Sequence, residues 1–294
     1  MTCLDKLTFS GGLQTKGIKK QFQENQPLIT IVTVVRNGEK TLEETILSVI
    51  NQAYSNIEYI IVDGASTDGT LDIIKKYEDR IDYWISEPDK GIYDAMNKGI
   101  DLAIGDWILF LGADDSLSSN ISDYYKNFND CDVVYYGHVI LIPSGKKYGG
   151  KYSRYTISYR NISHQAIFYP RHLLKKYHYS LRYPICADYY LNILLFSKGI
   201  KLEYINISIS YFRTGGYSST HKDIVFYREF YKIIIKLGIL PFLYSYFRYF
   251  IAQIIRIINF IFFCDLGTKR VKLIRYINRC LNNYRKLENN FFLK

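Results

Sequence analysis

Two adjacent acids, Asp114 and Asp115, follow an apolar run from Trp107 to Leu111 and a glycine at position 112. The apolar run predicts a buried strand. Acids just beyond the carboxyl end of a parallel strand lie where open α/β sheets bind ligands. Adjacent carboxylates repel each other, so they are best tolerated beside hydrogen-bond donors or a cation, such as a hard divalent ion that bridges two phosphates. Asp-Asp-Ser also makes ordinary solvated turns, and this segment alone leaves both interpretations open.

Three more polar residues stand where a sheet of this kind brings chemistry together. Asp63 ends a second apolar run, His164 stands beside a third, and Asp188 stands near the start of an expected helix. Each also has a structural interpretation. Asp63 suits a turn or a helix cap, His164 a hydrogen-bonded core histidine, and Asp188 an N-cap.

The elements that must position these residues alternate between strands and helices. Apolar runs predict strands at residues 28–35, 57–62, 83–85 and 107–111. Helical spacing of apolar residues predicts helices between them, the first opened by a capping box of Thr41 and Glu44. This alternation indicates a parallel sheet with right-handed crossovers. The carboxyl ends of its strands line one edge, where Asp63 and the Asp114–Asp115 pair can converge.

Composition limits the class of protein. The chain has 294 residues, of which 48 % are hydrophobic, so it is not a disordered protein. The five cysteines are scattered without a CxxC pair, which argues against a zinc ribbon or a disulfide framework and favours a reducing compartment. Residues 1–26 form a polar leader without an apolar core, so we expect no secretory signal peptide.

The net charge of +10 is concentrated near the carboxyl end, where residues 223–294 carry 13 Lys and Arg against 4 Asp and Glu. Two basic amphipathic helices are predicted there, at residues 241–263 and 271–287. They suit an anionic membrane surface, or packing and homo-oligomer formation. A spanning helix is disfavoured because Arg248 and Arg256 would each cost roughly 2.5–3.5 kcal/mol in the bilayer. The aromatic residues are spread along the chain, so we expect no nucleic-acid partner.

Two phosphate-binding motifs are absent from the sequence. It has neither the G-x-G-x-x-G motif nor the G-x-x-x-x-G-K-[ST] motif, which disfavours dinucleotide-binding Rossmann proteins and phosphate-loop NTPases. A sugar nucleotidyltransferase is disfavoured because no glycine-rich, basic phosphate signature follows the first strand.

Six segments in this order resemble family-2 glycosyltransferases of the GT-A fold, from about Pro27 to Ser219. They are TIVTVVRN with the SVINQ helix, IIVDGASTDGT, SEPDKGIYDAMNKGI, GDWILFLGADD, SHQAIFYP and ADYYL. The resemblance is to the subgroup that assembles bacterial exopolysaccharide, capsule or O-antigen units. It implies an α/β GT-A nucleotide-binding fold with a mostly parallel central sheet flanked by helices, plus a basic amphipathic helical tail. The implied domains are a leader (1–26), a catalytic domain (27–222, with a nucleotide-sugar half at 27–120 and an acceptor half at 121–222) and the tail (223–294).

The resemblance also implies a role for each matching residue. Asp188 matches the catalytic base and Asp115 the metal ligand. The nucleotide-sugar site is matched by Val34, Arg36, Asp63, Lys90, Asp94, Asn97, Asp114 and His164. The chain departs from the family at Gly64, where many members have a second acid that contacts the base.

The implied activity is inverting, metal-dependent transfer of a hexose or N-acetylhexosamine from a nucleotide sugar to a saccharide hydroxyl. Mn²⁺ or Mg²⁺ is the expected cofactor. UDP is the expected nucleotide from family frequency, with GDP and dTDP as alternatives. The expected acceptor is lipid-linked, for example to undecaprenyl diphosphate, with the protein cytoplasmic and peripheral on the inner face of the cell membrane. The alternative is a catalytically inactive GT-A-like scaffold or a membrane-binding protein.

Overall fold

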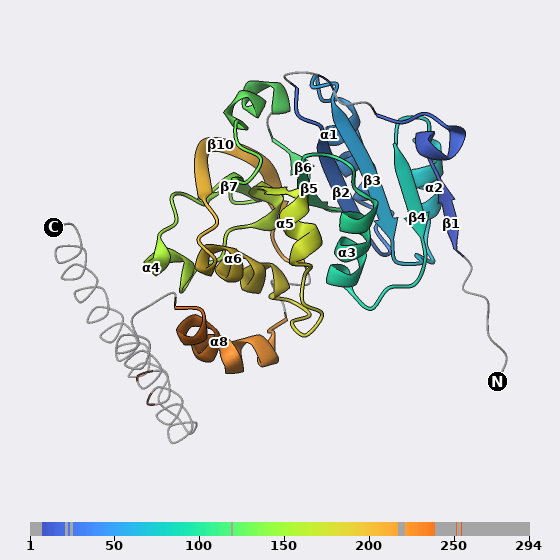
Figure 1. Cartoon of the computed structure of the whole chain (residues 1–294). Helices are drawn as coiled ribbons and strands as arrows, with labels where there is room; N and C mark the ends of the chain where they lie inside the picture. The colour runs from blue at the N-terminus through green and yellow to red at the C-terminus, as the bar shows by residue number, and fades with distance from the viewer. Residues whose placement is uncertain are drawn as a thin grey trace. The chain divides into compact units, whose positions relative to one another are not determined.

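The computed structural model describes residues 8–20, 23, 26–118, 120–216, 221–238, 251 and 254. Figure 1 shows the order of the elements along the chain. Their bounds are β1 Phe9–Gly11, η1 Leu13–Lys16, β2 Ile29–Val35, α1 Leu42–Ile50, β3 Ile57–Asp63, α2 Thr70–Lys76, β4 Tyr83–Ser86, α3 Ile92–Leu102, β5 Trp107–Gly112, β6 Ser116–Leu117, η2 Ile121–Asp123, η3 Tyr125–Asn127, β7 Val134–Ile142, β8 Lys147–Tyr148, α4 Arg154–Ile157, η4 His164–Ala166, β9 Ile167–Pro170, α5 Arg171–Lys176, α6 Ala187–Ser197, β10 Leu202–Arg213 and α8 Ile224–Lys236.

The described strands form one sheet in the order β1-β4-β3-β2-β5-β9-β7-β10-β6, with β8 paired to β7. Strands β4, β3, β2 and β5 run parallel. Strand β9 is antiparallel to β5 and β7, and β10 is parallel to β7. The fold is therefore the expected α/β arrangement with a mostly parallel centre. The antiparallel strand β9 connects the parallel strands of the first half to β7 and β10 of the second half.

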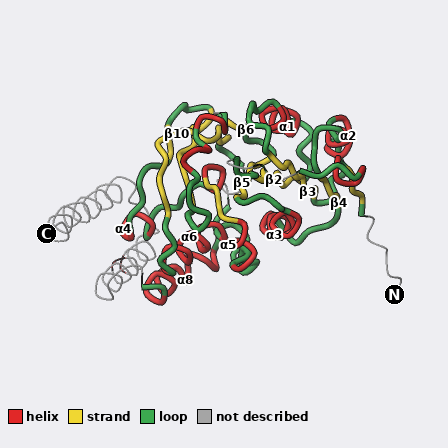
Figure 2. Tube along the Cα trace, turned by 45° about the horizontal axis from the view of Figure 1, so that its top comes forward, coloured by secondary structure: helices red, strands yellow, loops and turns green. Residues whose placement is uncertain are grey.

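Helices cover both faces of the parallel strands. Helices α1 and α2 lie on one face of the sheet and α3 lies on the other (Figure 2). The chain steps outward from β2 to β3 and β4 and then returns through α3 to β5, on the other side of β2. Since crossovers are right-handed, reversing the direction of travel moves the connecting helix to the opposite face. The sheet therefore has a topological switch point between β2 and β5, where α/β folds bind ligands.

The predicted strands and helices of the first half are confirmed to within two residues at most ends. One prediction of local detail is wrong. Thr41 is the N-cap of α1, but its side chain makes no capping hydrogen bond. Glu44 instead accepts a hydrogen bond from Arg213 Nη2 at 3.2 Å. Its carboxylate therefore joins α1 to the end of β10 and closes no capping box.

The predicted leader needs a correction, because part of it belongs to the sheet. Strand β1 pairs antiparallel with β4 and so forms the sheet edge. Just after it, Gln14 Nε2 donates to the fully buried Glu58 carboxylate at 3.0 Å, which Thr30 also contacts at 2.6 Å. A buried carboxylate needs such donors. Residues of the leader therefore cover a polar group in the sheet.

The boundary predicted at residue 222 also needs a correction. Helix α8 packs into the core through Phe226, Ile233 and Ile234. Its N-cap, Asp223, accepts hydrogen bonds from the backbone nitrogens of Ile185 and Cys186, both at 3.1 Å. The first compact unit accordingly extends over Met1–Pro241. The start of the predicted tail supports α6.

We expect Phe226→Ala to lower the free energy of unfolding by about 3–5 kcal/mol, because the ring is fully buried and its removal leaves a cavity. The ring lies 5.4 Å from both Tyr183 and Tyr189. Urea denaturation followed by circular dichroism measures the loss. The control is Ile224→Ala in the same helix, where the side chain is 69 % exposed and the expected change is below about 0.5 kcal/mol. Equal effects of the two variants would contradict the packing of α8 against α6.

The helices predicted at residues 241–263 and 271–287 lie outside the described residues, apart from positions 251 and 254. In the part of the chain that is described, no helix is long and apolar enough to cross a membrane.

Candidate active site

The Asp114–Asp115 pair lies at the switch point, between the end of β5 and the short strand β6. Strand β6 pairs with the end of β10, which brings Arg213 to the pair. Asp114 is exposed and Asp115 is 3 % exposed. The two neighbours therefore present different surfaces, one carboxylate to solvent and one to the protein.

Donors from two distant segments hold the buried carboxylate of Asp115. Gln165 Nε2 donates to Oδ2 at 3.0 Å, and the backbone nitrogen of Arg213 donates to Oδ1 at 3.0 Å. The carbonyl oxygen of Asp115 accepts from Thr45 Oγ1 at 2.7 Å. The turn after β5 is thus fixed by α1, η4 and β10 together.

Burial, and after it the neighbouring charge of Asp114, raise the pKa of Asp115 to about 6. The hydrogen bonds from Arg213 and Gln165 and the nearby His164 act against this rise. Desolvation disfavours the charged form of a carboxyl group. A cation beside Asp115 would therefore favour its ionised form.

The carboxylate of Asp188 lies in the first turn of α6, where Cys186 is the N-cap, so its role is not that of a cap. Four donors surround it. Oδ1 accepts from the Tyr93 hydroxyl at 2.9 Å and from the backbone nitrogen of Tyr189 at 2.7 Å. Oδ2 accepts from Asn161 Nδ2 at 2.9 Å and lies 3.1 Å from His164 Nδ1. Asp188 is 8 % exposed, so most of its surface is spent on these contacts.

One short turn, η4, joins the two acidic groups. His164 contacts Asp188, and the next residue, Gln165, contacts Asp115. The carbonyl oxygen of Gln165 accepts from Ser210 Oγ at 2.8 Å, which fixes η4 to β10. The structure therefore brings together Asp115, His164 and Asp188, which lie far apart in the sequence.

Asp63 ends β3 beside β2, as the sequence predicts, but it is fully buried. Its carboxylate accepts from Ser66 N and Oγ at 3.0 and 2.5 Å and from Ser86 Oγ at 2.6 Å. The loop after β3 is joined to the loop after β2, because Asn37 N donates to Ser66 Oγ at 2.7 Å. Asp63 thus shapes the two loops at the switch point.

Another acid lies against the glycine at position 64. A Cβ atom on Gly64 would lie 2.2 Å from Asp89 Oδ2 and 3.5 Å from Arg36 Cβ. Asp89 therefore places a carboxylate where a side chain at position 64 would stand. Arg36 is exposed beside it, and Val34 is buried one residue from the end of β2.

The predicted residues of the third segment lie around the start of α3. The exposed Lys90 donates its backbone nitrogen to Asp94 Oδ2 at 2.9 Å. Asn97 uses both ends of its amide on the backbone of Tyr179, each at 2.9 Å. Asn97 therefore holds the loop before α6 in place.

A pocket of about 490 Å³ opens beside the acidic pair. It is lined by the loop after β2 (residues 37–41), Asp68, Asp114 and the end of β10 with its following turn (residues 213–216). Of the predicted site residues, Asp114 alone lines it. The guanidinium of Arg213 adds a positive charge there, held by the Asp114 carbonyl oxygen at 3.3 Å and by Glu44.

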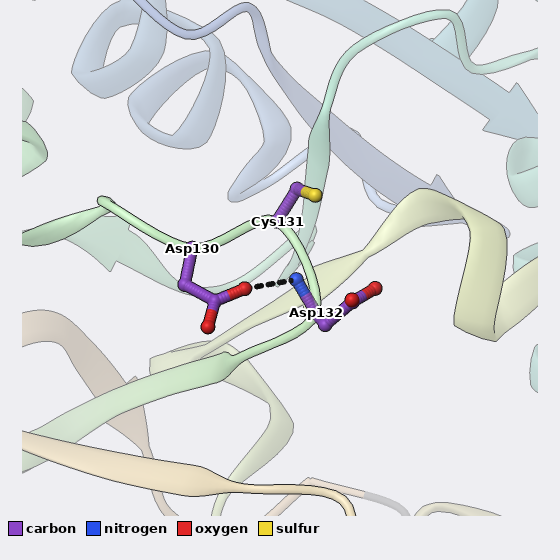
Figure 3. A group of neighbouring side chains, drawn as sticks. All are labelled: Asp130, Cys131 and Asp132. Carbon is purple, nitrogen blue, oxygen red and sulfur yellow. Dashed lines mark hydrogen bonds between the residues drawn. The ribbon is translucent and has the colours of Figure 1, made fainter.

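A second group of ligand-type side chains, Asp130, Cys131 and Asp132, lies in an exposed turn before β7, with its ligand atoms within 4.8 Å of one another. Figure 3 shows the Asp130 carboxylate directed at the backbone nitrogen of Asp132, a 3.0 Å hydrogen bond. Asp132 in turn pairs with His172 at 3.1 Å. These contacts account for both carboxylates.

A comparison of the sequence with models of protein families identifies the family of this chain. The model of glycosyl transferase family 2 matches residues 30–197, the span from β2 to the end of α6 that holds both acidic groups. The chain belongs to this family. It is therefore a glycosyltransferase.

Similar proteins support the assignment. The chain is 36 % identical over 215 residues to a PGL/p-HBAD biosynthesis glycosyltransferase of Mycobacterium tuberculosis, covering 69 % of this chain and 84 % of that protein. It is 32 % identical over 126 residues to the putative teichuronic acid biosynthesis glycosyltransferase TuaG of Bacillus subtilis, covering 41 % and 50 %.

Solved structures share the fold. S. aureus TarS in complex with UDP superposes with a TM-score of 0.57 at 17 % identity, covering 74 % of this chain and 68 % of that one. The mannosyltransferase PcManGT from Pyrobaculum calidifontis, in complex with GDP-Man and Mn²⁺, gives 0.54 at 15 % identity, covering 72 % and 65 %. At such identities the likeness establishes the GT-A fold alone.

Sequence reasoning missed several residues that complete the site. Gln165 and Tyr93 stand inside segments of the resemblance, one residue from His164 and Asp94, but only the structure gives them partners. Arg213 and Asn161 stand outside every such segment. A basic residue at the end of a long strand is a weak signal, and a lone asparagine in a loop is none.

Proposed function

We propose that the protein transfers a sugar from a nucleoside-diphosphate sugar to a hydroxyl group of a saccharide acceptor, with inversion at the anomeric carbon. The observation that carries the proposal is the bridge through η4. In this turn His164 contacts Asp188, the carboxylate suited to act as a base, and Gln165 contacts Asp115, the carboxylate suited to bind a metal.

Asp188 is the proposed base. The acceptor hydroxyl attacks the anomeric carbon as the bond from that carbon to the diphosphate oxygen breaks. Its proton passes to Asp188 Oδ1, because Tyr93 can turn its single hydroxyl hydrogen to the Ile185 carbonyl oxygen at 2.8 Å and release that oxygen. A positioned carboxylate contributes typically about 10²–10⁴-fold to such a step. The four donors around Asp188 hold it in one orientation, which supports this role.

The acidic pair suits a divalent cation. Exposed Asp114 and buried Asp115 offer carboxylate oxygens, the ligands that Mg²⁺ and Mn²⁺ accept. In the described part of the chain each Asp115 oxygen accepts one hydrogen bond, which leaves a lone pair on each oxygen for a ligand. Bound there, the ion would supply charge neutralisation for the diphosphate leaving group. PcManGT was solved with Mn²⁺ in a related fold.

The donor is proposed to lie over the switch point. Val34, Arg36 and Asp63 border its nucleoside end and Asp114 its ribose, while Lys90, Asp94 and His164 lie toward the sugar and diphosphate. We leave Asn97 out of this set because its amide is spent on Tyr179. Arg213 joins the set, since its guanidinium faces the same pocket as Asp114.

The acceptor is proposed to be a lipid-linked saccharide in bacterial glycan synthesis. The relatives named for PGL/p-HBAD and teichuronic acid biosynthesis support a glycan product. A cytoplasmic site at the inner face of the membrane follows if the basic tail binds anionic lipid. Liposome sedimentation of the full chain against one ending at residue 241 tests the tail separately.

The proposed donor site is tested by thermal unfolding of the full chain with UDP, GDP or dTDP, each with Mn²⁺ or with chelator. We expect one nucleotide to stabilise the protein with Mn²⁺ by about 2.7 kcal/mol at a hundred times its dissociation constant, and by less with chelator. Release of that nucleotide from its sugar donors then measures turnover. A folded protein that binds none of the three would contradict the proposal and favour an inactive scaffold.

A further inference from the structure

We propose that Asn161 is a positioning residue for the base, holding Asp188 Oδ2 through a relay of amides that begins at Tyr169. The inference rests on the proposed function. It assigns a role in the reaction to a loop residue outside every segment of the family resemblance.

The relay runs in one direction through two buried side chains and the half-buried Asn161. The Tyr169 hydroxyl donates to Asn192 Oδ1 at 2.7 Å, and Asn192 Nδ2 donates to Asn161 Oδ1 at 2.9 Å. Asn161 Nδ2 then donates to Asp188 Oδ2 at 2.9 Å. Tyr169 and Asn192 are both fully buried. The relay therefore ends on the carboxylate with an N–H group.

A backbone carbonyl fixes the orientation of both amides. Asn192 Nδ2 also lies 3.3 Å from the carbonyl oxygen of Ile162, which can only accept a hydrogen bond. The amide nitrogen of Asn192 must therefore face that side, and its oxygen must face Tyr169. Asn161 then turns its own oxygen to Asn192, which leaves its nitrogen for Asp188. Burial raises the pKa of Tyr169 well above its ordinary value, so the phenol stays a donor at every useful pH.

The backbone of Asn161 is held as firmly as its side chain. Its carbonyl oxygen accepts from the Tyr148 hydroxyl at 2.8 Å and the Tyr152 hydroxyl at 2.6 Å. The neighbouring Arg160 guanidinium lies over the Tyr148 ring at 4.2 Å. A side chain on a loop loses precision unless its backbone is fixed, and these contacts fix it.

Asn161 complements the other groups on Asp188. Tyr93 and the Tyr189 backbone occupy Oδ1, while Asn161 and His164 share Oδ2. His164 faces the turn that leads to Asp115, so it is the partner nearer the donor. Asn161 holds Oδ2 through the relay from Tyr169, and the two residues together restrict the orientation of the carboxylate.

The test is a double-mutant cycle on the full chain, with nucleotide release from the donor that the wild-type protein turns over. We expect Asn161→Ala to lower turnover between about tenfold and a hundredfold, as for a lost hydrogen bond to a charged group. In the Asp188→Asn background the same change has no further effect, because the group it positions is no longer a base. The dissociation constant of UDP with Mn²⁺, or of whichever of the three nucleotides the wild-type protein binds, stays within twofold of the wild-type value.

Two further variants sharpen the cycle. Asn161→Asp keeps the shape but replaces the donor with a carboxylate facing Asp188, so it lowers turnover more than alanine does. It carries the test if the alanine variant does not fold. Asn127→Ala is the matched control, because Asn127 is an exposed asparagine whose side chain donates to the Tyr124 carbonyl oxygen, far from Asp188 in the sequence. It leaves turnover unchanged.

Each outcome bears on one proposal. Suppose that Asn161→Ala lowers turnover equally in the wild-type and Asp188→Asn backgrounds, or in proportion to weaker nucleotide binding. Either result would mean a structural role for Asn161 and overturn the inference. If Asn161→Ala turned over as fast as the wild-type protein, the inference would be overturned and the proposed function would stand. Absence of turnover in the wild-type chain with every donor would contradict the proposed function, and the inference with it.

Discussion

Asp188→Asn is expected to lower turnover by about three orders of magnitude while nucleotide binding stays near the wild-type level. The amide has the shape of the carboxylate but cannot take the proton of the attacking hydroxyl, and a general base contributes typically about 10²–10⁴-fold. Asp188 lies in α6, apart from the acidic pair, and is joined to it through η4. Release of nucleotide at saturating donor measures the first quantity, and thermal stabilisation by nucleotide with Mn²⁺ measures the second.

A folding defect has to be separated from the loss of a base. An asparagine at position 188 presents an N–H group to one of its present donors, so the variant is expected to lose about 1–3 kcal/mol of stability. Circular dichroism and a melting curve measure this loss of stability and show whether the variant is folded at the assay temperature. Asp72→Asn is the matched control, since Asp72 is an exposed acid in the first turn of α2. Turnover of Asp188→Asn within a few-fold of this control would assign the base elsewhere.

Asp115→Asn is expected to weaken nucleotide binding in the presence of Mn²⁺ between about tenfold and a hundredfold, because a charge-assisted contact to the cation is lost. Binding with chelator is expected to stay the same, since the nucleoside contacts lie on other loops. Isothermal titration of nucleotide with and without Mn²⁺ separates the two. Asp123→Asn, an exposed acid in η2, serves as the control. Equal loss with and without the ion would contradict a metal role for Asp115.

The same carboxyl group predicts a pH dependence. Its pKa of about 6 means that protons compete with the cation below pH 6, so binding that depends on Mn²⁺ weakens as the pH falls through 6. Asp115→Asn is expected to remove this dependence. The stability of the metal-free protein depends on pH in the opposite direction to its metal-dependent binding. The raised pKa makes ionised Asp115 unfavourable in the folded state, so the wild-type chain loses stability relative to the variant as pH rises from about 4 to 6. Parallel pH profiles of the two proteins would contradict the assignment.

Local sequence patterns were sufficient for the central part of the fold. β-branched and apolar runs predict β2, β3 and β5, because strands buried on both faces have near-continuous apolar sequences. Their alternation with helical segments fixes a parallel sheet, and parallel strands share a carboxyl edge. The acids at positions 63, 114 and 115 follow those strands, so their convergence is a consequence of topology. The choice of Asp188 came from the family resemblance, since the spacing of residues around it allows an N-cap equally well.

Tertiary structure decided the parts that depend on contacts between distant segments. Strand β1 has three residues, one of them a glycine, and is too short to show a periodic pattern; it forms because the edge of β4 pairs with it. Helix α8 looks like the rest of a basic amphipathic tail until Phe226 and Asp223 are seen against α6.

The same limit applies to the site. The side chains that orient Asp115 and Asp188, among them Gln165 and Asn161, are ordinary polar residues whose meaning lies in their partners. Gln165 is 50 positions from Asp115, and Asn161 is 27 from Asp188. The sequence by itself determined that Asp63, Asp114 and Asp115 lie at one edge of the sheet. Only the tertiary structure decided how they are held, because a hydrogen bond across such separations depends on distances that no local pattern of residues specifies.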